Sequence, residues 1–215
     1  MNGKSPLNSE NTLIIEPAAS WFFIAVVSDG ECKYHNVELV AKNNDAWLSI
    51  AVNKALEQAG MNHAGQVLLG AGPGSFTALR IAFSYVKARA WLQKSRVSTF
   101  SSVEFWQSFF DEDEQVFLLK ANRNLYYAHN EAATPAAWVE KLANEAKKIT
   151  IFENNYPGDN ALSAQAERVY EQPPAKSAAE IYRIIKGLEL EPTEALFELS
   201  PNYVYDLEYR KKEKI

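Results

Sequence analysis

Apolar residues gather in two short runs near the start of the chain, at residues 12–15 and 21–28, and each run has the length of a buried strand. The pair Asp29-Gly30 follows the second run. Such a pair supplies the positive φ angles that a tight hairpin needs, so a third strand is expected at residues 31–40. The chain is therefore predicted to open with a meander of three strands.

A helical period replaces this pattern after Asn44, which can cap a helix that ends at Gly60. Residues 67–69 then form a short buried strand, and a second helical pattern covers residues 75–94. The next strand is expected at residues 96–99. Because a long helix crosses back over the sheet between these two strands, we expect them to lie parallel.

The second half of the chain has a weaker, mixed pattern. It predicts helices at residues 102–110, 135–147 and 177–188, and strands at residues 116–119, 125–129 and 149–152. The acidic run at residues 111–114 is expected to be a solvated loop. The order of the elements predicts an α/β protein with a strong first lobe, residues 1–100, and a reduced second lobe, residues 101–215.

The length, net charge and cysteine count of the chain exclude several classes of protein. A chain of 215 residues is longer than one minimal core needs and shorter than two full-size domains of roughly 100–150 residues each. The formal net charge of −5 has the wrong sign for a protein that grips a phosphate backbone by itself. The single cysteine, Cys32, excludes an internal disulfide and a cysteine zinc cage, and a reducing, cytoplasmic setting is expected. The apolar runs are too short for a membrane helix, and no signal peptide is expected.

The most constrained stretch is Gly72-Pro73-Gly74-Ser75-Phe76-Thr77, called here the glycine turn. Its glycines allow a close backbone approach, Pro73 fixes one φ angle, and Ser75 can cap the following helix. Two interpretations stay open: a tight turn between sheet and helix, which the spacing favours, or a turn whose N–H groups hold an anion. Neither a Walker pattern nor the three-glycine dinucleotide fingerprint is present.

The helix after this turn carries two apolar stripes. The first stripe consists of Phe76, Leu79, Phe83, Val86 and Ala90, and the second of Ala78, Ile81, Ala82, Tyr85, Ala88 and Leu92. A helix that is apolar on two sides is buried within its own protein or against a partner. Ala78 and Ala82 lie one turn apart, and their small side chains would let another helix approach closely.

The run from Gly72 to Ile81, Gly-Pro-Gly-Ser-Phe-Thr-Ala-Leu-Arg-Ile, resembles the signature of the TsaB (YeaZ) family. A weaker similarity extends over most of the chain, including Ser101-Ser102-Val103-Glu104 and the closing Pro201-Asn202-Tyr203-Val204. The resemblance implies an actin-like ATPase fold (ASKHA, ribonuclease H-like) with a complete N-terminal lobe and a reduced C-terminal lobe.

The resemblance also implies a function. TsaB-like proteins are non-catalytic partners that bind and activate TsaD, which transfers a threonylcarbamoyl group to the tRNA adenosine beside the anticodon, together with the ATPase TsaE. A TsaD-like protein and a TsaE-like ATPase are therefore the expected partners of this chain. ATP would be used by the complex, and tRNA would be held only through the complex. If the helix face at Ala78, Ala82 and Tyr85 is a partner surface, we also expect the isolated chain to pair with a copy of itself as a homodimer. No catalytic residue, metal or cofactor is expected in this chain.

Site residues follow from the matching positions. An anion contact at the glycine turn would involve Gly72, Pro73, Gly74, Ser75 and Thr77. The family pairs through two helices of the first lobe, which correspond here to residues 44–59 and 75–94. The expected partner interface consists of Trp47, Ala51, Ala78, Arg80, Ala82, Tyr85 and Lys87.

Departures from the family pattern leave other functions open. Glu16-Pro17-Ala18 stands where the family has Asp-Thr-Ser, Lys120-Ala121-Asn122-Arg123 stands where it has Asp-Ala-Arg, and alanine replaces glycine at positions 78, 82 and 88. The alternatives are an actin-like ATPase or kinase that acts alone, and a metallohydrolase of the older glycoprotease description. The second is disfavoured because His35, His63 and His129 are far apart in sequence.

Overall fold

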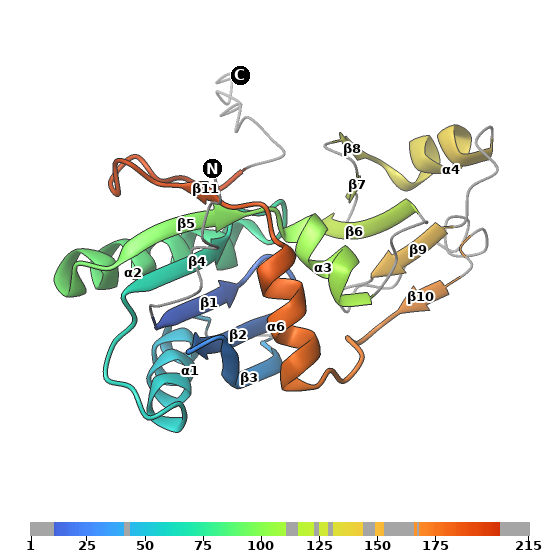
Figure 1. The fold of residues 1–215 in the computed structure, drawn as a ribbon. Helices are drawn as coiled ribbons and strands as arrows, with labels where there is room; N and C mark the ends of the chain where they lie inside the picture. Colours follow the sequence, from blue (N-terminus) through green and yellow to red (C-terminus); the bar gives the residue numbers. More distant parts are fainter. Residues whose placement is uncertain are drawn as a thin grey trace, which may run out of the picture.

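The computed structural model describes residues 11–40, 44–110, 116–122, 125–128, 131–143, 149–152, 166 and 168–202. Two sheets form two lobes, and helices cover the first sheet on both faces (Figure 1). No helix in these ranges is long and apolar enough to cross a membrane. The α/β class predicted from the sequence is confirmed.

The first sheet has six strands in the order β11-β5-β4-β1-β2-β3. Their bounds are β1 Thr12–Glu16, β2 Trp21–Ser28, β3 Glu31–Leu39, β4 Gln66–Gly70, β5 Arg96–Phe100 and β11 Glu191–Pro192. β1 pairs antiparallel with β2 and parallel with β4, and β4 pairs parallel with β5. The predicted meander and the predicted parallel pair are therefore both present. Asp29 and Gly30 have φ angles of 52° and 75°, as the hairpin requires.

Two helices, α1 (Asn44–Gln58) and α2 (Phe76–Gln93), cover one face of this sheet. Alternate strand residues point to this face, and Leu13, Ile15 and Leu69 pack there against the buried sides of both helices. Helix α1 begins at Asn44 itself, which is thus the first helical residue. Gly60 follows the helix with a φ angle of 72°, a left-handed conformation that suits glycine.

The opposite face is covered by α3 (Ser102–Phe110) and α6 (Ala178–Gly187). This core is rich in aromatic rings. Phe105 and Phe109 of α3 pack against Phe23 of β2, and Trp106 packs against both Phe105 and Phe109. The aromatic cluster continues from Trp106 to Phe152 in the second lobe, with ring centroids 5.0 Å apart. Helix α3 therefore joins the cores of the two lobes.

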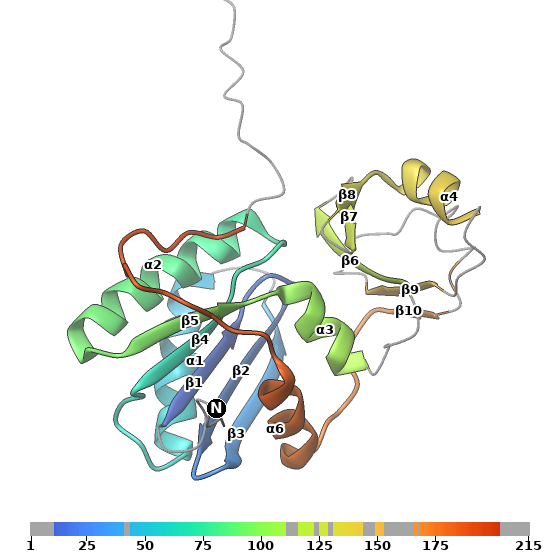
Figure 2. The ribbon, with the colours of Figure 1, turned by 45° about the horizontal axis from the view of Figure 1, so that its top comes forward.

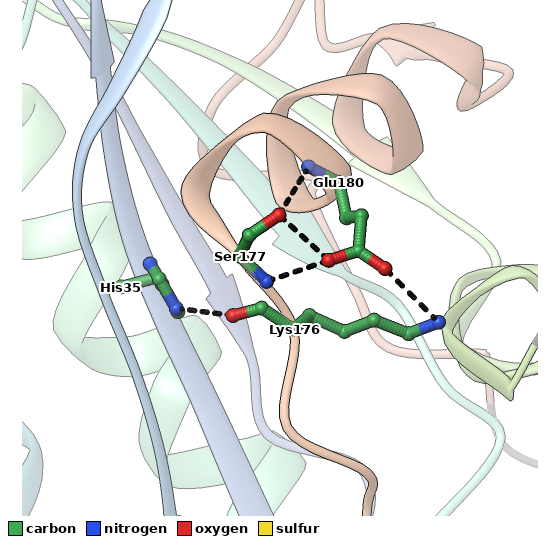
Figure 3. A network of polar contacts seen from close by, with 4 residues as sticks. All are labelled: His35, Lys176, Ser177 and Glu180. Atoms are coloured by element: carbon green, nitrogen blue, oxygen red, sulfur yellow. Dashed lines mark hydrogen bonds and ion pairs between the residues drawn. The ribbon is translucent and has the colours of Figure 1, made fainter.

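The start of α6 is held by a polar network (Figure 3). Ser177 caps the helix by accepting a hydrogen bond from the Glu180 N–H, and the Glu180 carboxylate accepts one from the Ser177 N–H in return. His35 Nε2 lies 3.0 Å from the Lys176 carbonyl oxygen, and because a carbonyl only accepts, His35 donates. The contact ties β3 to the segment that leads into α6.

The second sheet has the order β10-β9-β6-β7-β8. Its elements are β6 Val116–Asn122, β7 Leu125–Ala128, β8 Glu131–Ala133, β9 Ile149–Phe152, β10 Arg168–Tyr170 and the flanking helix α4 Pro135–Ala143. Five of the predicted elements of this half begin where the sequence placed them: α3, β6, β7, α4 and β9. The short strands β8 and β10 were not predicted, since three residues carry too little pattern to recognise.

The end of the described chain returns to the first lobe. After α6, β11 pairs with the edge strand β5, and residues 193–202, called here the strap, run from this edge along α2 (Figure 2). Leu196 and Leu199 of the strap pack into the core on the α1–α2 face. The second sheet lies entirely after the boundary expected at residue 100. However, α6, β11 and the strap also come after that boundary in sequence, and they lie with the first sheet.

Some sequence expectations concern residues outside the described ranges. They are the acidic loop at residues 111–114, the end of the helix predicted to residue 147, His129, and the closing Tyr203-Val204.

Candidate functional site

The glycine turn lies at the edge where three strands end. Glu16 is the last residue of β1, Gly70 is the last of β4, and Ser102 begins α3 directly after β5. These strands are parallel, so their carboxyl ends meet at the same edge of the sheet. In open α/β sheets this edge, beside the point where the strand order reverses, is the usual place for a ligand.

In this protein, the Glu16 side chain occupies the part of that edge where β1 ends. The Glu16 side chain is fully buried, and its Oε1 accepts a hydrogen bond of 2.8 Å from the Ala18 N–H. Its Oε2 accepts one of 2.7 Å from the Ser102 hydroxyl. The carboxylate also lies so close to Gly70 that a Cβ atom there would collide with Oε2. The carboxylate is thus enclosed by protein groups and faces no open cleft.

Burial changes the acidity of this group. Removal from water raises the pKa of Glu16 from 4.5 to about 7, and the hydrogen bonds from Ser102 and Ala18 oppose that rise. The carboxyl group is therefore partly protonated near neutral pH.

Two main-chain N–H groups of the glycine turn, those of Gly72 and Ser75, donate hydrogen bonds within the chain. Gly72 donates to the Ser102 Oγ at 3.0 Å, and Ser75 donates to the Ala18 carbonyl at 2.8 Å. Gly74 packs directly on Ala18, where a Cβ atom would collide with the carbonyl oxygen. On the other side, the Asn202 N–H of the strap donates to the Ala71 carbonyl at 2.7 Å. The turn is therefore held from three directions.

The first residues of α2 follow the sequence prediction. Ser75 is the N-cap, and its hydroxyl accepts from the Ala78 N–H at 3.4 Å. Thr77 is exposed in the first turn of the helix, whereas Pro73 is buried and Gly72 is held at a φ angle of 97°. Because Gly72 and Ser75 already donate within the chain, an anion would have to use the remaining groups of the turn. An anion contact here stays a prediction.

The expected partner interface on α1 and α2 needs a correction at two residues. Ala78 and Ala82 are 1% and 0% exposed, and both lie in the chain's own core. Ala78 packs with Phe22 and Val40, and Ala82 belongs to the cluster beneath both helices. The second apolar stripe therefore divides: Ala78 and Ala82 face the sheet, and only its other members are available to a partner.

The remaining interface residues lie at or near the surface. Trp47 and Ala51 are half-buried, and the Trp47 ring stands edge-on to Phe22 with centroids 5.1 Å apart. Arg80 is exposed, with its guanidinium 5.2 Å from the centroid of the Phe76 ring. Lys87 donates to the Phe197 carbonyl of the strap at 3.0 Å. Arg80 thus stacks on an aromatic ring of its own chain, and Lys87 donates to a main-chain oxygen of its own chain.

Tyr85 belongs to the seam between the two helices. Arg89 donates to the Tyr85 hydroxyl at 3.0 Å and to the Asn53 side-chain oxygen of α1 at 3.2 Å. The Arg89 Nε is buried and has no hydrogen-bond partner. One arginine therefore fixes α1 against α2.

Sequence reasoning missed the most exposed apolar residues of this pair. Ile50 on α1 is 67% exposed, and Trp91 and Leu92 at the end of α2 are 63% and 72% exposed. We call the surface of Ile50, Tyr85, Ala88, Trp91 and Leu92 the outer face of the helix pair. Leu92 belongs to the second apolar stripe, and that stripe was the available signal. Ile50 and Trp91 are single residues in mixed surroundings, which periodicity alone does not distinguish from core residues.

Metal and acid–base chemistry find little support in the described residues. Within them, no group of three or more His, Cys, Asp or Glu side chains could hold a metal ion. His35 is engaged with Lys176, and neither His35 nor His63 is a hydrogen-bond partner of Ser75 or Ser102.

We compared the sequence and the structure with known proteins. A family model described as "TsaD: tRNA N6-adenosine threonylcarbamoyltransferase" matches residues 37–177, well over half of the chain. No curated protein matches the sequence significantly.

Two solved structures share the fold. One is a protein from Pseudomonas aeruginosa with similarity to peptidase YEAZ; it is 16% identical, with a TM-score of 0.63 over 91% of this chain and 99% of that one. The other is YeaZ from Pseudomonas aeruginosa, also 16% identical, with a TM-score of 0.57 over 82% of this chain and 90% of that one. The expected actin-like α/β fold is thereby confirmed.

Proposed function

From the premise that the chain belongs to the TsaD family, as a TsaB (YeaZ)-type member, we propose that it is a non-catalytic subunit that binds and activates a TsaD-like enzyme. The enzyme would transfer the threonylcarbamoyl group to the tRNA adenosine beside the anticodon. The observation that carries the proposal is the outer face of the helix pair.

That face exposes apolar surface where a monomer would normally be polar. Ile50, Trp91 and Leu92 are each more than 60% exposed, and they lie on the two helices that cover the same side of the sheet. Burying each such side chain against a partner contributes roughly 1.5–3 kcal/mol. Large exposed apolar side chains on two neighbouring helices support a protein-binding surface.

The same surface is rigid before binding. Arg89 bridges α1 and α2 through Asn53 and Tyr85, and Lys87 links α2 to the strap. A surface that is already ordered loses little conformational entropy on binding, which favours affinity.

The contacts of Glu16 and Ser102 support the proposal that this chain is not itself catalytic. An acid that places metal and phosphates must face solvent or substrate, whereas the Glu16 carboxylate is enclosed by Ala18, Gly70 and Ser102. Ser102 is fully buried and donates to a carboxylate, so it is no nucleophile for a substrate outside. These contacts weigh against the two alternatives, an actin-like ATPase or kinase and a metallohydrolase.

The remaining parts of the reaction would come from other chains. The TsaD-like enzyme supplies the catalytic residues, a TsaE-like ATPase uses ATP, and tRNA is held by the complex because this chain carries a net charge of −5. The complex would work in the cytoplasm. When isolated, the chain would pair with a copy of itself through the same outer face.

Reconstitution tests the proposal. The TsaD-like and TsaE-like proteins of the same organism are combined with tRNA, ATP, and a threonylcarbamoyl donor, with and without this chain, and modified adenosine is measured. We expect modification to rise at least tenfold when the chain is added, and Glu16→Gln to leave that rise in place. Equal modification without the chain would contradict the proposal.

A further inference from the structure

A hollow of about 530 Å³ lies on the far side of the first lobe from the glycine turn. It is formed where β4 and β5 begin, whereas the glycine turn lies where β4 ends. Its walls include Gln66 of β4, Arg96 and Ser98 of β5, and residues of the strap. Ligand pockets typically measure about 300–1,000 Å³. The hollow is separate from the outer face of the helix pair and does not depend on the proposed function.

Gln66 is the unusual residue of this hollow. Its side chain is only 3% exposed, and its Oε1 is buried without a hydrogen-bond partner. Buried amides are almost always paired, because leaving one unpaired is costly. The neighbouring Gln66 N–H donates to the Asn11 carbonyl at 3.2 Å, so the main chain of this residue is fixed while its side-chain oxygen stays unused.

Strand register places two further polar groups beside this amide. Gln66 stands opposite Arg96 in the parallel pair, and Leu68 stands opposite Ser98. Since side chains alternate along a strand, Gln66, Arg96 and Ser98 point to the same side of the sheet. Leu190, Pro192 and Leu196 add apolar surface. The hollow thus combines one amide and the hydroxyl groups of Ser95, Ser98 and Thr193 with apolar surface, and such a combination is typical of a small-molecule site.

The charges of the lining indicate an uncharged ligand. Arg96 and Glu194 are the charged residues of the lining, and their formal charges cancel. The amide of Gln66 presents an acceptor oxygen beside an NH₂ donor. A group with a donor next to an acceptor, such as a carboxamide, a lactam or the edge of a nucleobase, can pair with both at once, as glutamine does with adenine.

We propose that the hollow binds a small uncharged molecule whose carboxamide, lactam or nucleobase edge pairs with the Gln66 amide. The ligand would donate an N–H to Oε1 and accept from the amide nitrogen. Its apolar part would lie against Leu190, Pro192 and Leu196. Occupation would satisfy the buried oxygen that the free protein leaves unpaired.

Two matched pairs of probes test this proposal on the full chain. Nicotinamide and adenosine carry the donor beside an acceptor, whereas N,N-dimethylnicotinamide and N6,N6-dimethyladenosine have lost the donor. Binding is followed by chemical-shift changes in a two-dimensional NMR spectrum of the ¹⁵N-labelled chain. We expect at least one parent probe to bind with shifts around Gln66 and Ser98, and its dimethyl analogue to bind roughly tenfold more weakly or less.

The variant Gln66→Leu separates binding from folding. It keeps the volume and removes the unpaired amide, so we expect an unchanged or higher melting temperature together with at least a tenfold loss of affinity for the probe. Gln58→Leu, an exposed glutamine on α1, is the matched control and should bind the probe as the original chain does. The proposal is overturned if neither parent probe binds better than its dimethyl analogue, or if Gln66→Leu binds the probe unchanged.

Discussion

The Ser102 hydroxyl donates to Glu16 Oε2 at 2.7 Å and accepts from the Gly72 N–H at 3.0 Å. One hydroxyl thus joins the end of β1, the start of α3 and the glycine turn. Ser102 lies 86 residues after Glu16 and 30 residues after Gly72 in the sequence. The glycine turn is positioned by this contact before α2 begins. The orientation of α2, and with it the outer face of the helix pair, depends on it.

Removing this hydroxyl should loosen the turn. Ser102→Ala leaves the buried Gly72 N–H and the Glu16 carboxylate each without one partner, and we expect a loss of about 2–3 kcal/mol in the free energy of unfolding. Urea denaturation followed by tryptophan fluorescence measures it. Ser84→Ala, at an exposed position of α2, is the control and should change stability by less than about 0.5 kcal/mol.

Stability should depend on pH through Glu16. The folded protein holds a proton with a pKa of about 7, whereas the ordinary value is 4.5, so the stabilising contribution is fully present below pH 4.5 and is lost as pH rises through 7. The whole change amounts to about 3 kcal/mol. Glu16→Gln lacks this titration, so the original chain should lose stability relative to this variant between pH 5 and pH 8. A difference that stays constant, or grows in favour of the original chain, would show that the carboxyl group is not held as described.

Gly70 and Glu16 should behave as a coupled pair. Gly70→Ala places a methyl group against Glu16 Oε2, so we expect a loss of about 2 kcal/mol or more. In the background Glu16→Ala the space is open, and the same substitution should cost much less. A double-mutant cycle by urea denaturation measures the difference. Additive effects would mean that the carboxylate does not lie against Gly70.

Ala82 and Leu92 should respond differently to the same substitution. Ala82→Arg forces a charge into the core beneath α1 and α2, and the variant should fail to fold or lose about 3 kcal/mol or more. Leu92→Arg changes an exposed residue, and should give a folded protein that no longer self-associates. Circular dichroism and light scattering distinguish the outcomes. A folded, monomeric Ala82→Arg protein would place that residue on a partner surface after all.

Much of the first lobe could be predicted from the sequence because its signals are local. The Asp29-Gly30 hairpin, the Ser75 cap and the apolar runs of β1 and β2 each identify an element without reference to the rest of the chain. The return of the strap to α2 could not be predicted in this way. It depends on contacts such as those of Asn202 with Ala71 and of Lys87 with Phe197, which join residues more than a hundred positions apart.

The candidate site shows the same limit. The two apolar stripes of α2 were recognised, but periodicity does not say which of them faces the sheet, and Ala78 and Ala82 proved to be core residues. Glu16 was recognised as a departure from Asp-Thr-Ser. Its burial against Gly70 and Ser102 depends on how three strands end at one edge, which only the assembled sheet determines.

The central claim is that this chain binds a TsaD-like enzyme through the outer face of its helix pair. The direct measurement is sedimentation velocity of the purified chain with the TsaD-like protein of the same organism, with Leu92→Glu as the test variant and Val169→Glu, an exposed apolar position of β10, as the matched control. We predict a one-to-one complex for the original chain and for Val169→Glu, and at least a tenfold weaker complex for Leu92→Glu. Separate sedimentation of the original chain and the enzyme, or equal binding by Leu92→Glu, would contradict the claim.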